Sequence, residues 1–148
     1  MKPFEILDIS GDAGIRAYGI TLQEAFLHAA SGMYGLITDI GKIEAKQSIT
    51  VSLENDSLES LLVAWLNELI FHFDAYGFIA KEISITVADL DPVPSPSLKS
   101  YRLRAVLSGE VFDPERHETR LLIKAATFHR LRIEKINEVW ETDVIFDI

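Results

Sequence analysis

The sequence predicts an α+β fold: a single domain with a mixed or antiparallel β-sheet and two main helices packed on one face. Two stretches carry apolar residues at helical spacing, and they alternate with stretches whose apolar residues recur at every second position. Several more strand-like segments follow the second helical stretch, and such a late run of strands is typical of α+β proteins. Because composition does not shift along the chain and no internal repeat occurs, we expect one domain over residues 1–148.

Two helices are predicted, each with recognisable ends. Thr21 and Glu24 have the spacing of a capping box, in which the threonine hydroxyl accepts from the Glu24 amide and the carboxylate reaches back. Asp56 or Ser57 caps the second helix, and Gly77 offers its stop. The two apolar stripes predict core helices rather than a cofactor platform, and they comprise Leu22, Ala25, Phe26, Ala29, Met33, Leu36 and Ile37, then Leu58, Leu61, Leu62, Trp65, Leu66, Leu69, Ile70 and Phe73.

Alternation of apolar and polar residues predicts the strands. Segments 43–53, 83–87 and 101–107 each have one apolar and one polar face, which is typical of a sheet with one face in water. We expect further strands at 121–127, 130–135 and 140–146, with residues 136–138 as the last turn. The proline-punctuated segment 91–97 is interpreted as an exposed connector between strands.

Composition excludes several function classes. The net charge is −9, with 14 basic against 23 acidic residues, which disfavours direct binding of nucleic acid through phosphate neutralisation. The acidic balance suits a cation site or a basic protein partner. The chain has no cysteine, no apolar run long enough to span a membrane and no signal-peptide pattern at its start, so we expect a cytoplasmic protein without membrane attachment.

The densest polar chemistry lies in residues 109–117. The Asp113-Pro114 dipeptide predicts a turn that would carry Glu110, Arg116 and His117 on a loop, where binding groups are common. The alternative is an ordinary solvated charged turn. The glycine-rich stretch 11–14 is not a nucleotide loop, because it lacks the required spacing and strand-like residues follow it.

Five segments stand out: Asp12-x-Gly14-Ile15-Arg16-Ala17-Tyr18-Gly19, Trp65-Leu66-Asn67-Glu68-Leu69, Gly109-Glu110-x-Phe112-Asp113-Pro114-x-Arg116-His117, Lys124-Ala125-x-Thr127-Phe128-His129 and Phe146-Asp147-Ile148. Taken together, they resemble the archease family from end to end. That resemblance implies a small accessory protein of RtcB-type RNA-splicing ligases, which join 2′,3′-cyclic phosphate or 3′-phosphate RNA ends to 5′-hydroxyl ends with GTP and manganese. Archeases promote guanylylation of the ligase and its multiple turnover, so RNA would be contacted only through the ligase.

The resemblance implies a metal site on Asp12, Asp147 and the C-terminal residue Ile148, with Lys124 also implicated in ligase activation. Asp147 and the α-carboxylate of Ile148 are adjacent anions, and if the last strand lies beside the Asp12 turn, three carboxylates converge and require a divalent cation. All-oxygen ligands select hard ions, so calcium is favoured, with manganese or magnesium as alternatives. The alternative is an exposed strand end beside an ordinary Asx turn.

The chain also departs from the family pattern. The usual His-Thr-Ala-Asp string is Ile9-Ser10-Gly11-Asp12 here, so the first-strand histidine is missing. His117 and His129 lie in motifs but receive no catalytic role. Two functions stay open: a non-catalytic ligase activator, and a small metal-dependent phosphodiester hydrolase with Asp12, Asp147, a water and one of these histidines as base. A general chaperone is a third possibility by analogy alone, and neither the oligomeric state nor the ligase-contacting surface can be predicted from the sequence.

Overall fold

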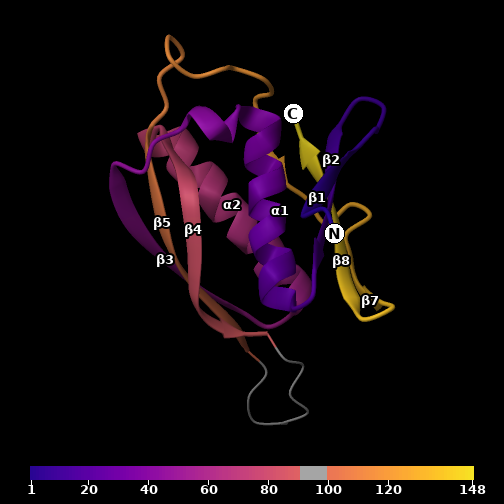
Figure 1. The fold of residues 1–148 in the computed structure, drawn as a ribbon. Helices are drawn as coiled ribbons and strands as arrows, with labels where there is room; N and C mark the ends of the chain where they lie inside the picture. The colour runs from indigo at the N-terminus through magenta and orange to yellow at the C-terminus, as the bar shows by residue number, and fades with distance from the viewer. Residues whose placement is uncertain (91–99) are drawn as a thin grey trace.

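The computed structural model describes residues 1–90 and 100–148, so the predicted connector at 91–97 lies outside the described residues. Figure 1 shows two helices between two groups of strands. In chain order the elements are β1 (Phe4–Leu7), β2 (Ala13–Gly19), α1 (Leu22–Ile37), the 3₁₀ helix η1 (Ile40–Lys42), β3 (Gln47–Asn55), α2 (Leu58–Tyr76), β4 (Phe78–Asp89), β5 (Tyr101–Val111), β6 (Ala125–Ala126), β7 (Arg132–Ile136) and β8 (Val139–Asp147).

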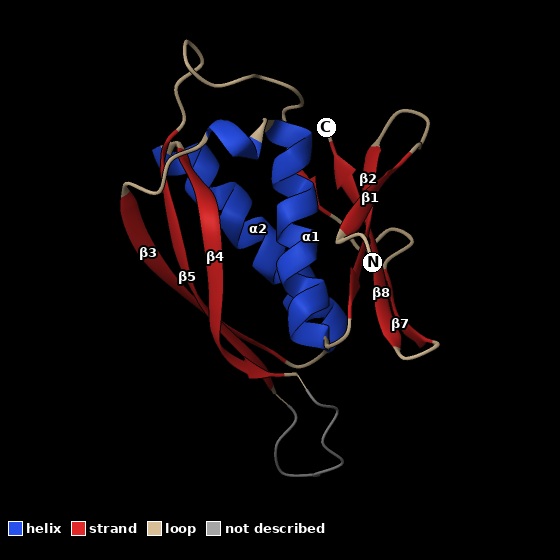
Figure 2. Ribbon diagram, viewed as in Figure 1, coloured by secondary structure: helices blue, strands red, loops and turns tan. Residues whose placement is uncertain are grey.

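The strands form two antiparallel sheets. The first has the order β1-β2-β8-β6, with β7 also pairing β8, and the second has the order β3-β5-β4. Both helices lie between the sheets (Figures 1 and 2), with α1 against β2 and α2 against the three-stranded sheet. The predicted single-domain α+β class is confirmed. The division into two sheets was not predicted, because period-two alternation identifies the buried face of a strand but not its partner.

The helix ends match the sequence signals. The Thr21 hydroxyl accepts from the Glu24 amide at 3.1 Å, and the Glu24 carboxylate accepts from the Ile20 amide at 3.1 Å. Ser57, rather than Asp56, caps α2 by accepting from the Ser60 amide at 3.0 Å. Gly77 ends α2 in the left-handed region at φ 68°, a conformation that glycine adopts at no steric cost.

One hydrophobic core joins the helices to both sheets. Phe26, Met33, Trp65 and Leu66 are fully buried within it, as the helical stripes predict. The Trp65 indole N–H donates to the Phe26 carbonyl at 3.0 Å. This buried hydrogen bond connects α2 to α1 and satisfies the indole N–H. No helix in the described part of the chain is long and apolar enough to cross a membrane.

Two strand predictions differ clearly from the structure. The segment predicted at 43–53 becomes a strand only from Gln47, and the segment predicted at 121–127 is a strand only at Ala125–Ala126. The amides of Arg120 and Leu121 donate instead to the last carbonyls of α1, at Ile37 and Leu36. The start of this segment therefore satisfies the end of a helix and does not pair with a strand. The predicted turn after Ile136 is confirmed, with φ of 51° at Asn137 and 65° at Glu138.

Candidate functional site

The β2–β8 ladder brings the two predicted acids to the same end of the first sheet. Its last pair is Ala13 with Phe146, so Asp12 and Asp147 are the next residues on the two strands. Figure 1 shows the β1–β2 turn and the C-terminus at this end. Both acids are exposed. Asp147 is four residues beyond Asp143 on β8, and the period of a strand therefore puts both on the face turned away from the helices.

Lys124 and Ile148 lie beside the same strand end. The Lys124 amide donates to the Asp147 carbonyl at 2.8 Å, and Ala125 pairs with Asp147 in the β6–β8 ladder. Asp147 therefore has the Lys124 segment on one side and the Asp12 turn on the other. Ile148 follows it directly and is 42% exposed. The structure thus brings together the backbones of all four residues that the sequence singles out.

The donor set at this end consists only of oxygen atoms. As metal ligands, the carboxylates of Asp12, Asp147 and Ile148 would suit calcium, magnesium or manganese rather than zinc. Within residues 1–90 and 100–148, no three His, Cys, Asp or Glu side chains are grouped so that they could hold a metal ion. Any site here would therefore depend on a donor besides these side chains, and the Ile148 carboxylate is the predicted one.

Asn67 holds β6 in place through its side-chain amide. Its Oδ1 accepts from the Ala126 amide at 2.8 Å, and its Nδ2 donates to the Ala126 carbonyl at 3.3 Å. The side chain therefore behaves like a neighbouring strand for one residue, and it connects α2 to the segment that carries Lys124. Sequence analysis assigns no role to Asn67, although the residue lies in one of the motifs. Its position as a polar residue beside the apolar stripe of the helix was the one signal that could have indicated this contact.

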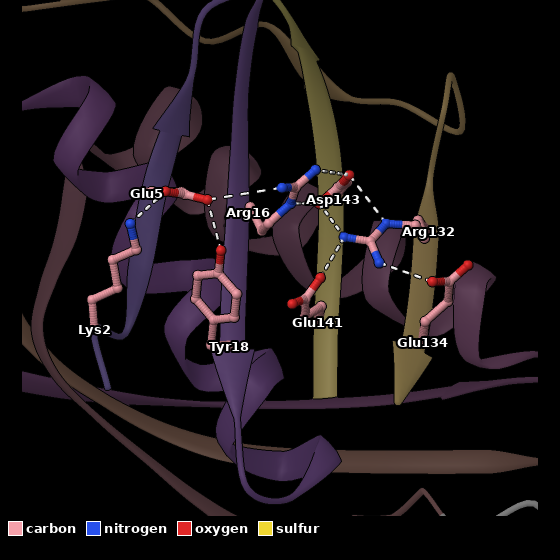
Figure 3. A network of polar contacts seen from close by, with 8 residues as sticks. All are labelled: Lys2, Glu5, Arg16, Tyr18, Arg132, Glu134, Glu141 and Asp143. Carbon is pink, nitrogen blue, oxygen red and sulfur yellow. Dashed lines mark hydrogen bonds and ion pairs between the residues drawn. The ribbon is translucent and has the colours of Figure 1, made fainter. Parts of the chain in front are cut away.

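A network of charged residues crosses the outer face of the first sheet, and Figure 3 shows it. Asp143 on β8 accepts from Arg16 Nε at 2.8 Å and from Arg132 Nη2 at 3.1 Å, so an acid on the central strand is bound by arginines from both neighbours. Burial alone would raise the pKa of Asp143, but the hydrogen bonds from Arg16 and Arg132 outweigh it and the pKa is lowered. Lys2, Glu5, Tyr18, Glu134 and Glu141 extend the network.

The polar side chains of residues 109–117 mostly bind one another and the neighbouring backbone, so they do not form an open loop of free polar groups. Glu110 lies within β5 and is 3% exposed; its carboxylate accepts from Arg116 and, at 2.6 Å, from the Glu44 amide. These two contacts lower the pKa of Glu110 to about 2. His117 is equally buried, and its Nδ1 accepts from the Asp113 amide at 2.9 Å. A histidine placed in this way cannot reach a substrate as a general base, which removes His117 from the hydrolase alternative.

A pocket of about 540 Å³ opens beside residues 109–117. Its polar walls include Lys46 and Arg116, and both cations already contact Glu110, with Lys46 Nζ 3.6 Å from Oε1. The remaining lining residues are Gln47, Glu110, Val111, Phe112, Asp113 and Pro114. The two cations are thus largely neutralised by the protein's own acids, so the pocket has no clear preference for a charged ligand. His129, the other histidine of the motifs, is exposed just after β6.

Comparison with known proteins identifies the relatives of this chain. The archease protein family model matches residues 4–148. Protein archease of Pyrococcus furiosus is 35% identical over 149 residues, covering 100% of both chains. Protein archease of Methanosarcina acetivorans is 36% identical over 152 residues, covering 99% of this chain and 97% of that protein.

Two solved structures share the fold. The solution structure of protein 1598 of Methanobacterium thermoautotrophicum has a TM-score of 0.79 and 32% identity, with 100% of each chain covered. The crystal structure of an archease from Thermotoga maritima, described as a possible chaperone, has a TM-score of 0.60 and covers 96% of this chain and 94% of its own. At 16% identity, the second likeness shows the fold alone.

Proposed function

Because this chain belongs to the archease family, we propose that it is an accessory protein that activates an RtcB-type RNA ligase. It promotes GTP-dependent guanylylation of the ligase and so allows repeated rounds of RNA joining in tRNA splicing or RNA repair. The chain itself is not the catalyst. RNA is contacted by the ligase, in keeping with a net charge of −9, which opposes direct binding of a polyphosphate.

One structural observation supports the site of this activity: the β2–β8 register that ends at Ala13 and Phe146. It makes Asp12 and Asp147 neighbours although the residues come from opposite ends of the chain. In the described residues neither side chain is paired with a Lys or Arg side chain within 4.0 Å. Anions placed together without a protein cation favour an external one. We assign Asp12, Asp147 and Ile148 as its ligands.

Calcium is the ion that best suits this proposal, with manganese and magnesium as alternatives. The site is exposed and its ligands come from a turn and a strand end, which suits the tolerant coordination geometry of calcium better than the strict octahedron of magnesium. A bound hard cation would supply concentrated positive charge at a surface that can face the ligase. Lys124, fixed beside Asp147 by its backbone hydrogen bond, is the residue of this chain that we expect to contact the partner directly.

The decisive measurement is guanylylation of a cognate RtcB-type ligase with GTP and manganese, with and without this protein in catalytic amounts. We expect faster guanylylation and conversion of single-turnover RNA joining into multiple turnover. An unchanged rate and extent would contradict the proposal. Hydrolysis of phosphodiester substrates by this chain alone, without ligase, would support the hydrolase instead.

Variants at the site test the assignment of residues. Asp12→Asn, Asp147→Asn and deletion of Ile148 should each remove activation while leaving the melting temperature close to wild type, because all three residues are exposed. Lys124→Ala should weaken activation without abolishing calcium binding. Asp8→Asn is the matched control: Asp8 is an exposed aspartate before the same turn and is not among the proposed ligands. Normal activation by all three site variants would refute the assignment.

A further inference from the structure

Asp12 is the last residue of a tight turn that begins at Ile9. The Asp12 amide donates to the Ile9 carbonyl at 3.4 Å, and Gly11 at the third position has φ 81°. Ser10 is not among the residues with positive φ. This combination describes a type II turn, whose third position requires the left-handed region that glycine readily adopts. The position of Ile9 therefore determines the position of the Asp12 backbone.

Ile9 lies in space that Gly14 leaves free. A Cβ built on Gly14 would lie 2.6 Å from Ile9 Cδ1, 3.0 Å from Ile145 Cδ1 and 3.3 Å from the Val144 carbonyl oxygen. Gly14 and Ile145 are paired residues of the β2–β8 ladder, so the side chains of Ile9 and Ile145 meet over the glycine. A side chain at position 14 would therefore force the Ile9 side chain to shift from this place.

The burial of Ile145 supports this contact independently. Ile145 is only 4% exposed, yet it is absent from the hydrophobic core cluster that contains its neighbours Val144 and Phe146. The alternation of strand residues explains why, since Ile145 projects from the face of β8 opposite to those two. Its cover must come from the outer side of the sheet, where Ile9 Cδ1 lies only 2.6 Å from the Cβ position that Gly14 leaves empty.

We propose that Ile9 is a positioning residue for Asp12: seated over Gly14 and against Ile145, it holds the Ile9–Asp12 turn at the end of the β2–β8 ladder, next to Asp147. This inference rests on the proposed function insofar as the turn serves a calcium site. Ile9 contacts neither the ion nor the ligase. Its effect reaches the carboxylate through the turn, in the way that residues behind metal ligands fix ligand orientation.

The test uses the full chain freed of metal and titrated with calcium in a calorimeter. Ile9→Ala removes the anchor, and Gly14→Ala displaces it; each should weaken calcium binding about tenfold, as for other residues that orient metal ligands. In the Ile9→Ala background, adding Gly14→Ala should weaken binding little further, because the clash partner has gone. Gly32→Ala is the matched control, since its Cβ would also crowd side chains, at 3.1 Å from Ile15 Cδ1 and from Phe4 Cγ, but from α1 on the core side of β2.

A second readout in the metal-free protein separates this inference from the metal site. Hydrogen exchange at the Asp12 amide should be faster in Ile9→Ala than in wild type or Gly32→Ala, with the melting temperature showing that the fold is retained. If wild type binds calcium and Ile9→Ala binds it equally well, the positioning role is refuted and the metal site stands. If wild type binds no calcium, the metal site is refuted, and unchanged Asp12 exchange in Ile9→Ala would then refute the positioning role as well.

Discussion

Replacing Asn67 should loosen the strand that lies beside the candidate site. The Asn67→Ala variant removes two hydrogen bonds to the Ala126 backbone, each worth about 1 kcal/mol net. Ala126 is 5% exposed, so water cannot easily replace them. The higher helix propensity of alanine offsets up to about 0.7 kcal/mol within α2. With the desolvated backbone groups left unpaired, we expect a net loss of about 2 kcal/mol in the free energy of unfolding.

Urea unfolding and thermal melting measure this loss. For a chain of this size, about 2 kcal/mol lowers the melting temperature by roughly 4–8 °C. Asn67→Asp is the sharper variant, because it keeps the acceptor for the Ala126 amide and loses the donor. Amide exchange at Ala126 should therefore accelerate in Asn67→Ala and stay slow in Asn67→Asp. If exchange at Ala126 and the urea midpoint were both unchanged in Asn67→Ala, the side chain would not hold β6, and the reasoning would fail.

Two further predictions concern the polar networks. The lowered pKa of Glu110 means that its contribution to stability is complete above pH 4.5 and is lost as pH falls toward about 2, where the folded-state carboxylate takes up its proton. Glu110→Gln should therefore lower stability at neutral pH and flatten the dependence between these pH values in acid unfolding curves. Asp143→Asn should cost about 1–3 kcal/mol in urea unfolding, because it removes the acid between two arginines. Asp89→Asn, which breaks an exposed pair, should cost no more than about 1 kcal/mol, and equal losses in the two variants would contradict the network argument.

The helices could be predicted closely because their signals are local. The Thr21 cap, the Ser57 cap and the glycine stop at Gly77 each depend on residues within one turn of the helix. The strand at 121–127 was overestimated for the opposite reason. Its apolar residues satisfy the pattern of a strand, but the amides of Arg120 and Leu121 donate to the end of α1, more than eighty residues away in the chain. No local pattern contains that information.

The candidate site likewise combines residues that local motifs indicate with contacts that only the folded chain reveals. Motifs could select Asp12, Asp147 and Lys124, but only the ladder register makes them neighbours. The supporting residues were harder to recognise. Gly14 looked like part of a loose glycine-rich stretch, and Ile9 like a simple loss of the family's histidine. The structure gives both a role that depends on Ile145, a residue from the far end of the chain.

The two acids on the outer face of β8 differ in their surroundings, and this difference explains how one strand can serve both stability and binding. Asp143 is bound by Arg16 and Arg132, so its charge is compensated within the protein and it fixes β8 between β2 and β7. Asp147, four residues further on, lies beside the Asp12 turn and the Lys124–Ala125 backbone, and among the described residues no Lys or Arg side chain lies within 4.0 Å of its carboxylate. The paired charge of Asp143 stabilises the register of β8. The unpaired charge of Asp147 stays exposed to water, so it costs little desolvation free energy. The proposed cation would therefore bind at Asp147 without disturbing Asp143.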